Sequence, residues 1–116
     1  LALAAQILVD AAPTGLTYHA IGTDTVPPAA LNIRLGVEVA REALVQKDAV
    51  GDTITLTAFY LSGTCAYNIK EAGIFGALAT ATLNSGTLFA HFLQTYNNAS
   101  SPSDLSFEYV LELANA

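Results

Sequence analysis

Alternating apolar and polar positions predict β-strands along most of this chain. The stretch Leu16–Gly22 alternates in this way, and Thr53–Tyr60 places its apolar side chains on one face and its threonines on the other. Residues 105–113 show the clearest alternation, which only Val110 interrupts. Residues 67–76 and 87–93, which contain β-branched and aromatic side chains, are also expected to be strands.

The segments between these strands carry turn-forming and small polar residues. Loops are expected at residues 22–30, 79–86 and 94–104. The first contains Pro27 and Pro28. Residues 35–41 are either helical or extended, whereas residues 42–50 are expected to form a strand that ends at a Gly51 turn.

Before the first strand, apolar residues recur at helical spacing from Leu1 to Leu8, and Pro13 and Gly15 would stop a helix. This start resembles part of a signal peptide but has no basic leader, so a short helix is the preferred interpretation. Strands with turns between them and one short helix predict a mainly β fold, an antiparallel β-sandwich or jelly roll. The 116 residues suffice for one domain, residues 1–116.

Composition and charge narrow the classes of partner. The chain is 53% hydrophobic and only 12% charged, which favours an oligomer or assembly component whose apolar surface another chain covers. A net charge of −6 argues against nucleic acid and anionic membrane surfaces as partners. No apolar run is long enough to span a bilayer. The single cysteine, Cys65, excludes an intrachain disulfide and CxxC sites.

No motif in the sequence predicts catalysis or a cofactor. His19 and His91 lack the spacing of zinc ligands and are expected to be structural. The serines are not in a GxSxG motif, and no phosphate-binding loop is present. We therefore expect no catalytic residue, no cofactor and no metal site.

Glu71 is the one residue whose chemistry conflicts with its surroundings. In a strand over residues 67–76 it shares a face with Tyr67, Ile69 and Phe75, so it would be buried if that face is the core. A buried carboxylate needs a partner. Arg41 is the predicted partner, because a guanidinium binds a carboxylate through two hydrogen bonds, and backbone N–H groups of the Gly22 loop are the alternative.

Glycines mark the end of the Glu71 strand. Gly73 and Gly76 stand on either side of Ile74 and Phe75. Glycine inside a strand often marks a bulge or a close approach of backbone. A kinked strand that turns Phe75 into the core is therefore expected.

Motifs in this order resemble the N-terminal domain of tail-fibre proteins of tailed bacteriophages and prophages. A Y-x-A-[IV]-G-x-G strand and loop, an L-x-x-E-x-x-R segment and an [IR]-x-E-x-G-[IL]-F strand are similar to stretches here. The matching residues are Tyr18, Ala20, Ile21, Gly22, Leu35, Glu38, Arg41, Ile69, Glu71, Gly73, Ile74 and Phe75. Asp24 stands where the family has a second glycine, and no fibre shaft is expected after the domain.

The resemblance implies a non-enzymatic structural protein of the virion. It would bind other virion proteins of the tail or baseplate as an accessory or adaptor domain, and form a homo-oligomer, such as a trimer. A capsid decoration (cement) protein bound to the major capsid protein and a host-glycan-binding module are the alternatives. The segments expected to dock are the two chain ends, residues 1–13 and 114–116, and the loops over residues 22–30 and 94–104. Their candidate contact residues are Leu3, Ile7, Pro27, Pro28 and Tyr96.

Overall fold

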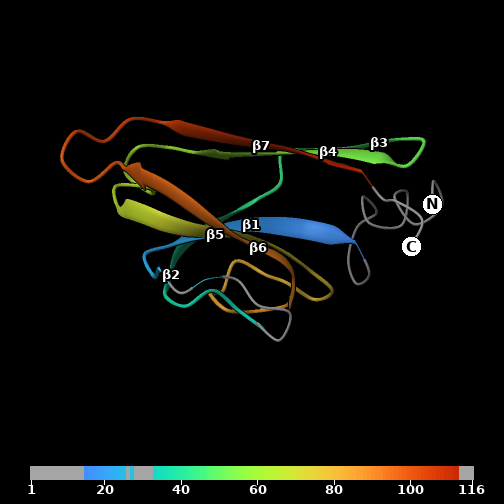
Figure 1. Cartoon of the computed structure of the whole chain (residues 1–116), viewed down its shortest axis with the longest axis horizontal. Helices are drawn as coiled ribbons and strands as arrows, with labels where there is room; N and C mark the ends of the chain where they lie inside the picture. Colours follow the sequence, from blue (N-terminus) through green and yellow to red (C-terminus); the bar gives the residue numbers. More distant parts are fainter. Residues whose placement is uncertain (1–14, 26, 28–32, 113–116) are drawn as a thin grey trace.

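The computed structural model describes residues 15–25, 27 and 33–112. Within these ranges the chain forms seven β-strands, and all of their pairings are antiparallel (Figure 1). The strands are β1 (Leu16–Gly22), β2 (Glu38–Ala43), β3 (Gln46–Val50), β4 (Thr53–Tyr60), β5 (Asn68–Gly76), β6 (Thr87–Asn97) and β7 (Leu105–Glu112). The prediction of a mainly β fold is confirmed. The expected N-terminal helix lies outside the described residues.

The strands form two layers that enclose an apolar core. One sheet has the order β2-β1-β5-β6 and the other β3-β4-β7 (Figure 1). Ile21 of the first sheet packs with Tyr60 and Phe107 of the second, and Ile74 packs with Ile54 and Leu56. The apolar face expected for Thr53–Tyr60 is confirmed, because all four of its inward side chains are buried.

The chain passes directly from one sheet to the other between β2 and β3. Leu44 N donates to Thr17 O in the first sheet, and Val45 N donates to Thr57 O in the second. The single strand expected over residues 42–50 is therefore wrong. Periodicity misses this break, because a bend at a single residue, Val45, is enough to pass the chain from one sheet to the other.

A second apolar cluster covers the opposite face of the four-stranded sheet, here called the outer face. It contains Ala20, Leu35, Phe75 and Ala79. Ile69 instead packs with Tyr60 between the sheets, so the expectation that Ile69 and Phe75 share one core is wrong. The pairing of β5 with β6 is irregular between positions 69 and 71, which allows the two side chains to enter different clusters.

The outer face positions the polar cluster described next. Two segments, residues 33–37 and 77–86, pass over this face. Each has one buried side chain in the apolar cluster, Leu35 in the first and Ala79 in the second. Strand β6 is longer than expected and reaches Asn97, so only residues 98–104 of the predicted 94–104 loop connect β6 to β7. Among the described residues no helix has the length and apolarity needed to cross a membrane.

Candidate functional site: a buried polar cluster on the outer face

Glu71 lies fully buried on the outer face, where backbone N–H groups surround its carboxylate. Gly36 N donates to Oε1 at 2.9 Å, and Val37 N and Asp24 N donate to Oε2 at 2.8 and 3.0 Å. Charge-assisted hydrogen bonds of this kind offset the cost of removing a carboxylate from water. One side chain thereby holds two separate segments, residues 22–25 and 33–37, against the sheet.

His91 completes the environment of Glu71. Its Nε2 atom lies 2.9 Å from Oε1 of Glu71, and it reaches there because His91 pairs with Gly73 on the neighbouring strand. Sequence reasoning expected a structural histidine but missed this contact. The signal that could have found it is the position of His91 in an alternating strand, which in the structure is β6, the direct neighbour of the strand that carries Glu71.

The predicted Arg41–Glu71 pair is wrong, because Arg41 binds Glu38. Nε donates to Oε2 at 2.6 Å and Nη2 donates to Oε1 at 2.9 Å, and both side chains are almost completely buried. The alternative prediction for Glu71 is confirmed for the Gly22 loop through Asp24 N. Gly36 and Val37, the other backbone donors, were not predicted.

An irregular strand pairing explains why Glu38 and Arg41 meet. Residues three apart in a regular strand point to opposite faces. The pairing of β1 with β2 shifts between Ile21 and Gly22, where Ile21 is opposite Ala40 and Gly22 is opposite Glu38. The extra residue in β2 turns Glu38 to the face that Arg41 occupies.

Arg41 also fastens the loop over residues 77–86. Its Nη1 donates to Thr80 O at 3.0 Å and to Ser85 O at 3.1 Å, and Asn84 N donates to Glu38 Oε1 at 3.0 Å. The guanidinium carbon lies 4.4 Å from the centre of the Phe75 ring, a cation–π distance. The loop is thus held by the same ion pair that the strand irregularity creates.

Glycines of the motifs allow the close packing of this cluster. A Cβ atom at Gly22 would overlap the Glu71 carboxylate and Val37 O. One at Gly73 would lie 2.8 Å from Leu35 Cδ2, and one at Gly76 would overlap Gly15 O. The pairing of β5 with β6 is irregular between Ile74 and Phe75, so the expected irregularity in the glycine-flanked stretch is present.

The outer-face cluster therefore gathers residues of all three motifs, from β1, β2 and β5, together with His91 of β6, whereas the motif residues Ile21, Ile69 and Ile74 pack between the sheets. The cluster contains Tyr18, Gly22, Glu38, Arg41, Glu71, Gly73, Phe75 and His91, with Gly76 at the end of β5. Every carboxylate oxygen of Glu38 and Glu71 accepts a hydrogen bond from this chain. Within the described ranges no three His, Cys, Asp or Glu side chains are placed to hold a metal ion.

A second polar group lies between the sheets around His19. Its Nδ1 and Nε2 are each 2.8 Å from a tyrosine hydroxyl, those of Tyr60 and Tyr109. Burial lowers the pKa of His19 to about 3 and raises the pKa of both tyrosines. The ring is therefore neutral at neutral pH, and its role is structural.

The connection from β6 to β7 is closed by Asn98, which sequence reasoning did not select. Nδ2 donates to Cys65 O at 2.9 Å and to Ser103 O at 3.0 Å, while Ser103 N donates to Oδ1. Burial raises the pKa of the Cys65 thiol, which keeps it protonated. This group fixes the loop over residues 98–104.

Two of the residues expected to dock, Pro27 and Tyr96, lie in the described part of the chain. Pro27 is exposed, and Tyr96 is 49% exposed on β6, beside a cleft. Leu3, Ile7 and Pro28 lie outside the described residues.

Comparisons with known proteins add no family to this picture. No protein-family model matches the sequence, and a comparison with curated proteins gives no significant match.

Proposed function

We propose that this chain is a non-enzymatic structural protein of a tailed-phage virion, a β-sandwich that docks on the tail or baseplate. The observation that carries the proposal is the convergence of the three motifs on one buried cluster. Its charged groups bind backbone and side chains of this chain, so the cluster positions loops and offers no free reacting group. The sheet orders, with seven described strands, favour a sandwich over an eight-stranded jelly roll.

The loops that the cluster holds carry exposed apolar side chains. Ile33 and Val37 lie on one covering segment, and Leu78 and Leu83 lie on the other, with Ile33 75% and Leu78 72% exposed. We call these four residues the apolar loop surface. Leu78 adopts a φ of +73°, which is rare for a bulky residue and supports a conformation imposed for contact with a partner.

Presentation of apolar residues on anchored loops suits binding to another protein. A loop already fixed by buried hydrogen bonds loses little conformational entropy when it is covered. The low proportion of charged residues and the high proportion of hydrophobic residues also favour binding to another protein. Self-association into a homo-oligomer is part of this proposal, and sedimentation of the purified domain tests it.

Particle assembly with surface variants tests the docking role. The double variant Ile33→Ser and Leu78→Ser should fold normally and be lost from purified particles. The matched control is the double variant Val50→Ser and Val110→Ser. It changes similarly exposed residues on the three-stranded sheet, on the side that points away from the core. Normal incorporation of the first variant would reject docking through this surface.

Labelling of intact particles tests the location. Antibody against the domain should decorate the tail or its baseplate in electron micrographs. Decoration of the head would instead support the capsid-cement alternative. Absence of label from particles that contain all other virion proteins would count against a virion role altogether.

A further inference from the structure

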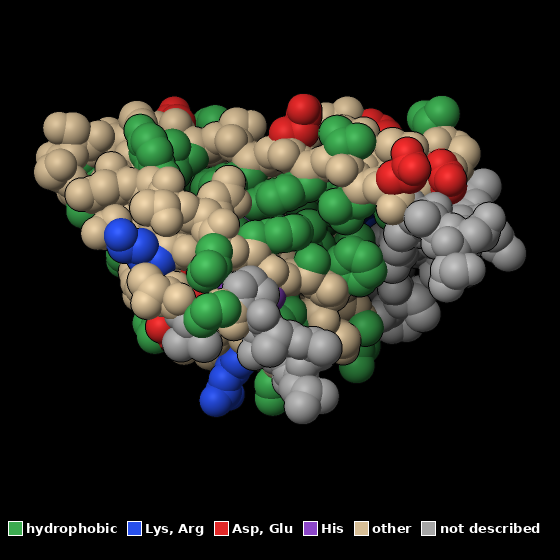
Figure 2. All heavy atoms as spheres, viewed as in Figure 1, with side chains coloured by type: hydrophobic (Ala, Val, Ile, Leu, Met, Phe, Trp, Pro, Cys, Tyr) green, Lys and Arg blue, Asp and Glu red, His purple; other side chains and the backbone are tan. Residues whose placement is uncertain are grey.

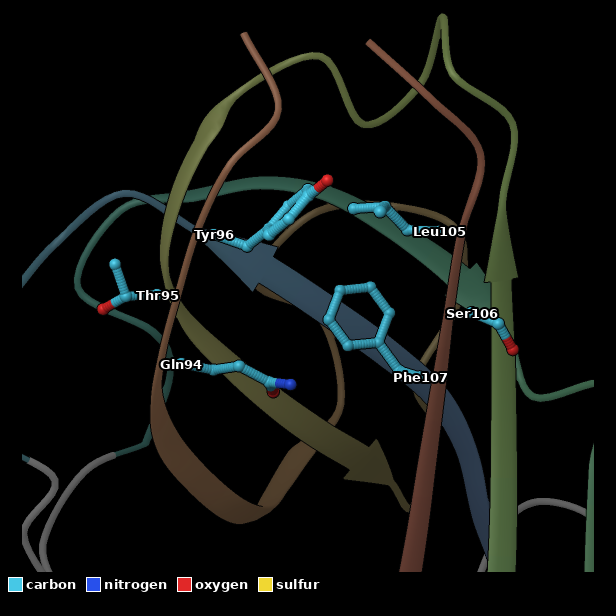
Figure 3. A pocket seen from close by; sticks show the side chains of 6 residues that line it. All are labelled: Gln94, Thr95, Tyr96, Leu105, Ser106 and Phe107. Carbon is cyan, nitrogen blue, oxygen red and sulfur yellow. The ribbon is translucent and has the colours of Figure 1, made fainter. Parts of the chain in front are cut away.

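A cleft opens where the two sheets separate along β6 and β7. Its volume is about 280 Å³, and its walls are Gln94, Thr95, Tyr96, Leu105, Ser106 and Phe107. Figure 3 shows Tyr96, Leu105, Phe107 and the amide of Gln94 directed into the space between the two strands, whereas Thr95 and Ser106 point away. Apolar side chains also gather between the two layers in Figure 2.

Both walls are edge strands. Strand β6 pairs only with β5, and β7 pairs only with β4, among the strands that the structure describes. Edge strands carry unpaired N–H and C=O groups that can bind another extended chain. The backbone beside this cleft thus matches a peptide in the β conformation better than a compact ligand.

A hydrogen-bonded chain that starts in the core orients the Gln94 amide. Tyr109 Oη donates to Gln94 Oε1 at 2.8 Å and lies 2.8 Å from His19 Nε2. The Nδ1 atom lies 2.8 Å from the hydroxyl of Tyr60, which donates to His19 O at 2.9 Å. With its oxygen engaged, Gln94 presents its NH₂ group to the cleft (Figure 3).

The charges around the cleft indicate which kind of peptide it would bind. None of the lining residues is charged. Asp104 immediately precedes β7 and Glu108 lies on it; both are exposed next to the lining segment, on the same side of the strand as Ser106, and the whole chain carries a net charge of −6. An apolar segment with basic flanks complements this arrangement, whereas an acidic peptide does not.

We infer that this cleft binds one short extended peptide of a partner protein, apolar at its centre and basic at its ends, added as a strand to the edge of β7. An apolar side chain of the peptide lies against Tyr96, Leu105 and Phe107. One of its carbonyl groups accepts a hydrogen bond from Gln94 Nε2. The inference rests on the proposed docking function for the source of the peptide, a neighbouring virion protein.

Titration of the ¹⁵N-labelled domain with a defined peptide tests the site. The probe is acetyl-Lys-Thr-Leu-Thr-Leu-Thr-Lys-amide, and the expected result is saturable shifts of the Gln94 side-chain NH₂ and of backbone amides 94–96 and 105–107. The variants Gln94→Glu and Tyr96→Ala should each bind roughly tenfold more weakly. Phe59→Ala, a similarly exposed aromatic on the other sheet, should bind as the wild type does.

Two further probes and a measurement without any probe test the binding mode and other occupants. A peptide with an N-methyl group on every residue has no backbone N–H to donate from either edge, and its binding at equal strength would overturn strand addition. Saturable shifts at the same amides with methyl β-galactoside alone would identify a glycan site and overturn the inference. Concentration-dependent shifts at these amides without any probe would identify a second copy of this chain as the occupant.

The titration also separates this inference from the proposed function. If the peptide does not bind but the apolar loop surface is needed for incorporation into particles, only the cleft inference fails. If the peptide binds while the domain is absent from particles, the cleft stands and the virion function fails.

Discussion

The Arg41 guanidinium and the Glu38 carboxylate form a buried, doubly hydrogen-bonded ion pair, with Nε 2.6 Å from Oε2 and Nη2 2.9 Å from Oε1. A pair with this geometry fixes both side chains in a single arrangement. The remaining donors of Arg41 reach Thr80 O and Ser85 O, so the pair links strand β2 to the loop over residues 77–86.

Removal of the charge at Glu38 should therefore reduce the stability of the fold. Glu38→Gln leaves the Arg41 charge buried without its counter-ion, and the free energy of unfolding should fall by about 3 kcal/mol. Urea denaturation measures this. Glu108→Gln, on an exposed position of β7, is the control and should change stability by less than about 0.5 kcal/mol. Equal effects of the two variants would contradict a structural ion pair.

Glu71→Gln should loosen the segments that its carboxylate holds. The amide NH₂ of glutamine cannot accept from the surrounding backbone donors, so at least one N–H group loses its partner. The substitution should increase the amide hydrogen exchange rates of Asp24, Gly36 and Val37 much more than it increases those of strand β4. Glu112→Gln, which is exposed, should leave these rates unchanged. Unchanged protection in the Glu71 variant would show that the carboxylate does not anchor these segments.

A methyl group at Gly22 should be poorly tolerated. The added Cβ would overlap the Glu71 carboxylate and Val37 O, so Gly22→Ala is expected to cost about 1–3 kcal/mol. Gly63→Ala is a matched control, because no atom lies within 4 Å of the position where its Cβ would be. Thermal unfolding of the two variants gives the comparison, and equal melting temperatures would refute the close approach.

Acid should destabilise the fold through His19. Burial lowers its pKa from 6.5 to about 3 in the folded chain, so between these values the unfolded chain binds more protons. The free energy of unfolding should thus fall as pH drops through this window, by up to about 1.4 kcal/mol per pH unit.

The variant His19→Phe isolates this contribution. Its stability should depend less steeply on pH between 6.5 and about 3 than that of the wild type. Denaturant titrations at several pH values give both curves, and ¹⁵N shifts of the wild-type ring at neutral pH should show a neutral imidazole. Parallel curves would mean that His19 titrates alike in both states.

The strands could be predicted wherever one face is buried and the other exposed. Strands β4 and β7 pair over their whole lengths and keep a strict two-residue period, even at the exposed Val110. The division of residues 38–50 into two strands could not be predicted. It depends on which sheet Leu44 and Val45 bond to, and periodicity carries no information about the partner of a strand.

Several residues of the candidate site were predicted, but their pairing was not, and the contacts of His91, Gly36 and Val37 with Glu71 were missed. Burial of Glu71 followed from its place among apolar residues, and its need for partners followed from burial. The choice between Arg41 and backbone donors depended on the irregularity at Gly22, which reverses the direction of Glu38. A one-residue irregularity leaves no clear mark in a single sequence.

The buried amide of Asn98 has a consequence for production of this protein in eukaryotic secretory hosts. Asn98, Ala99 and Ser100 form an N-glycosylation sequon, yet Asn98 is only 1% exposed and its Nδ2 binds Cys65 O and Ser103 O. An oligosaccharide attached to that nitrogen before folding would displace both bonds and hold the β6–β7 connection open. The secreted protein should therefore be unmodified and folded, whereas glycosylated chain should be retained in the cell as misfolded protein.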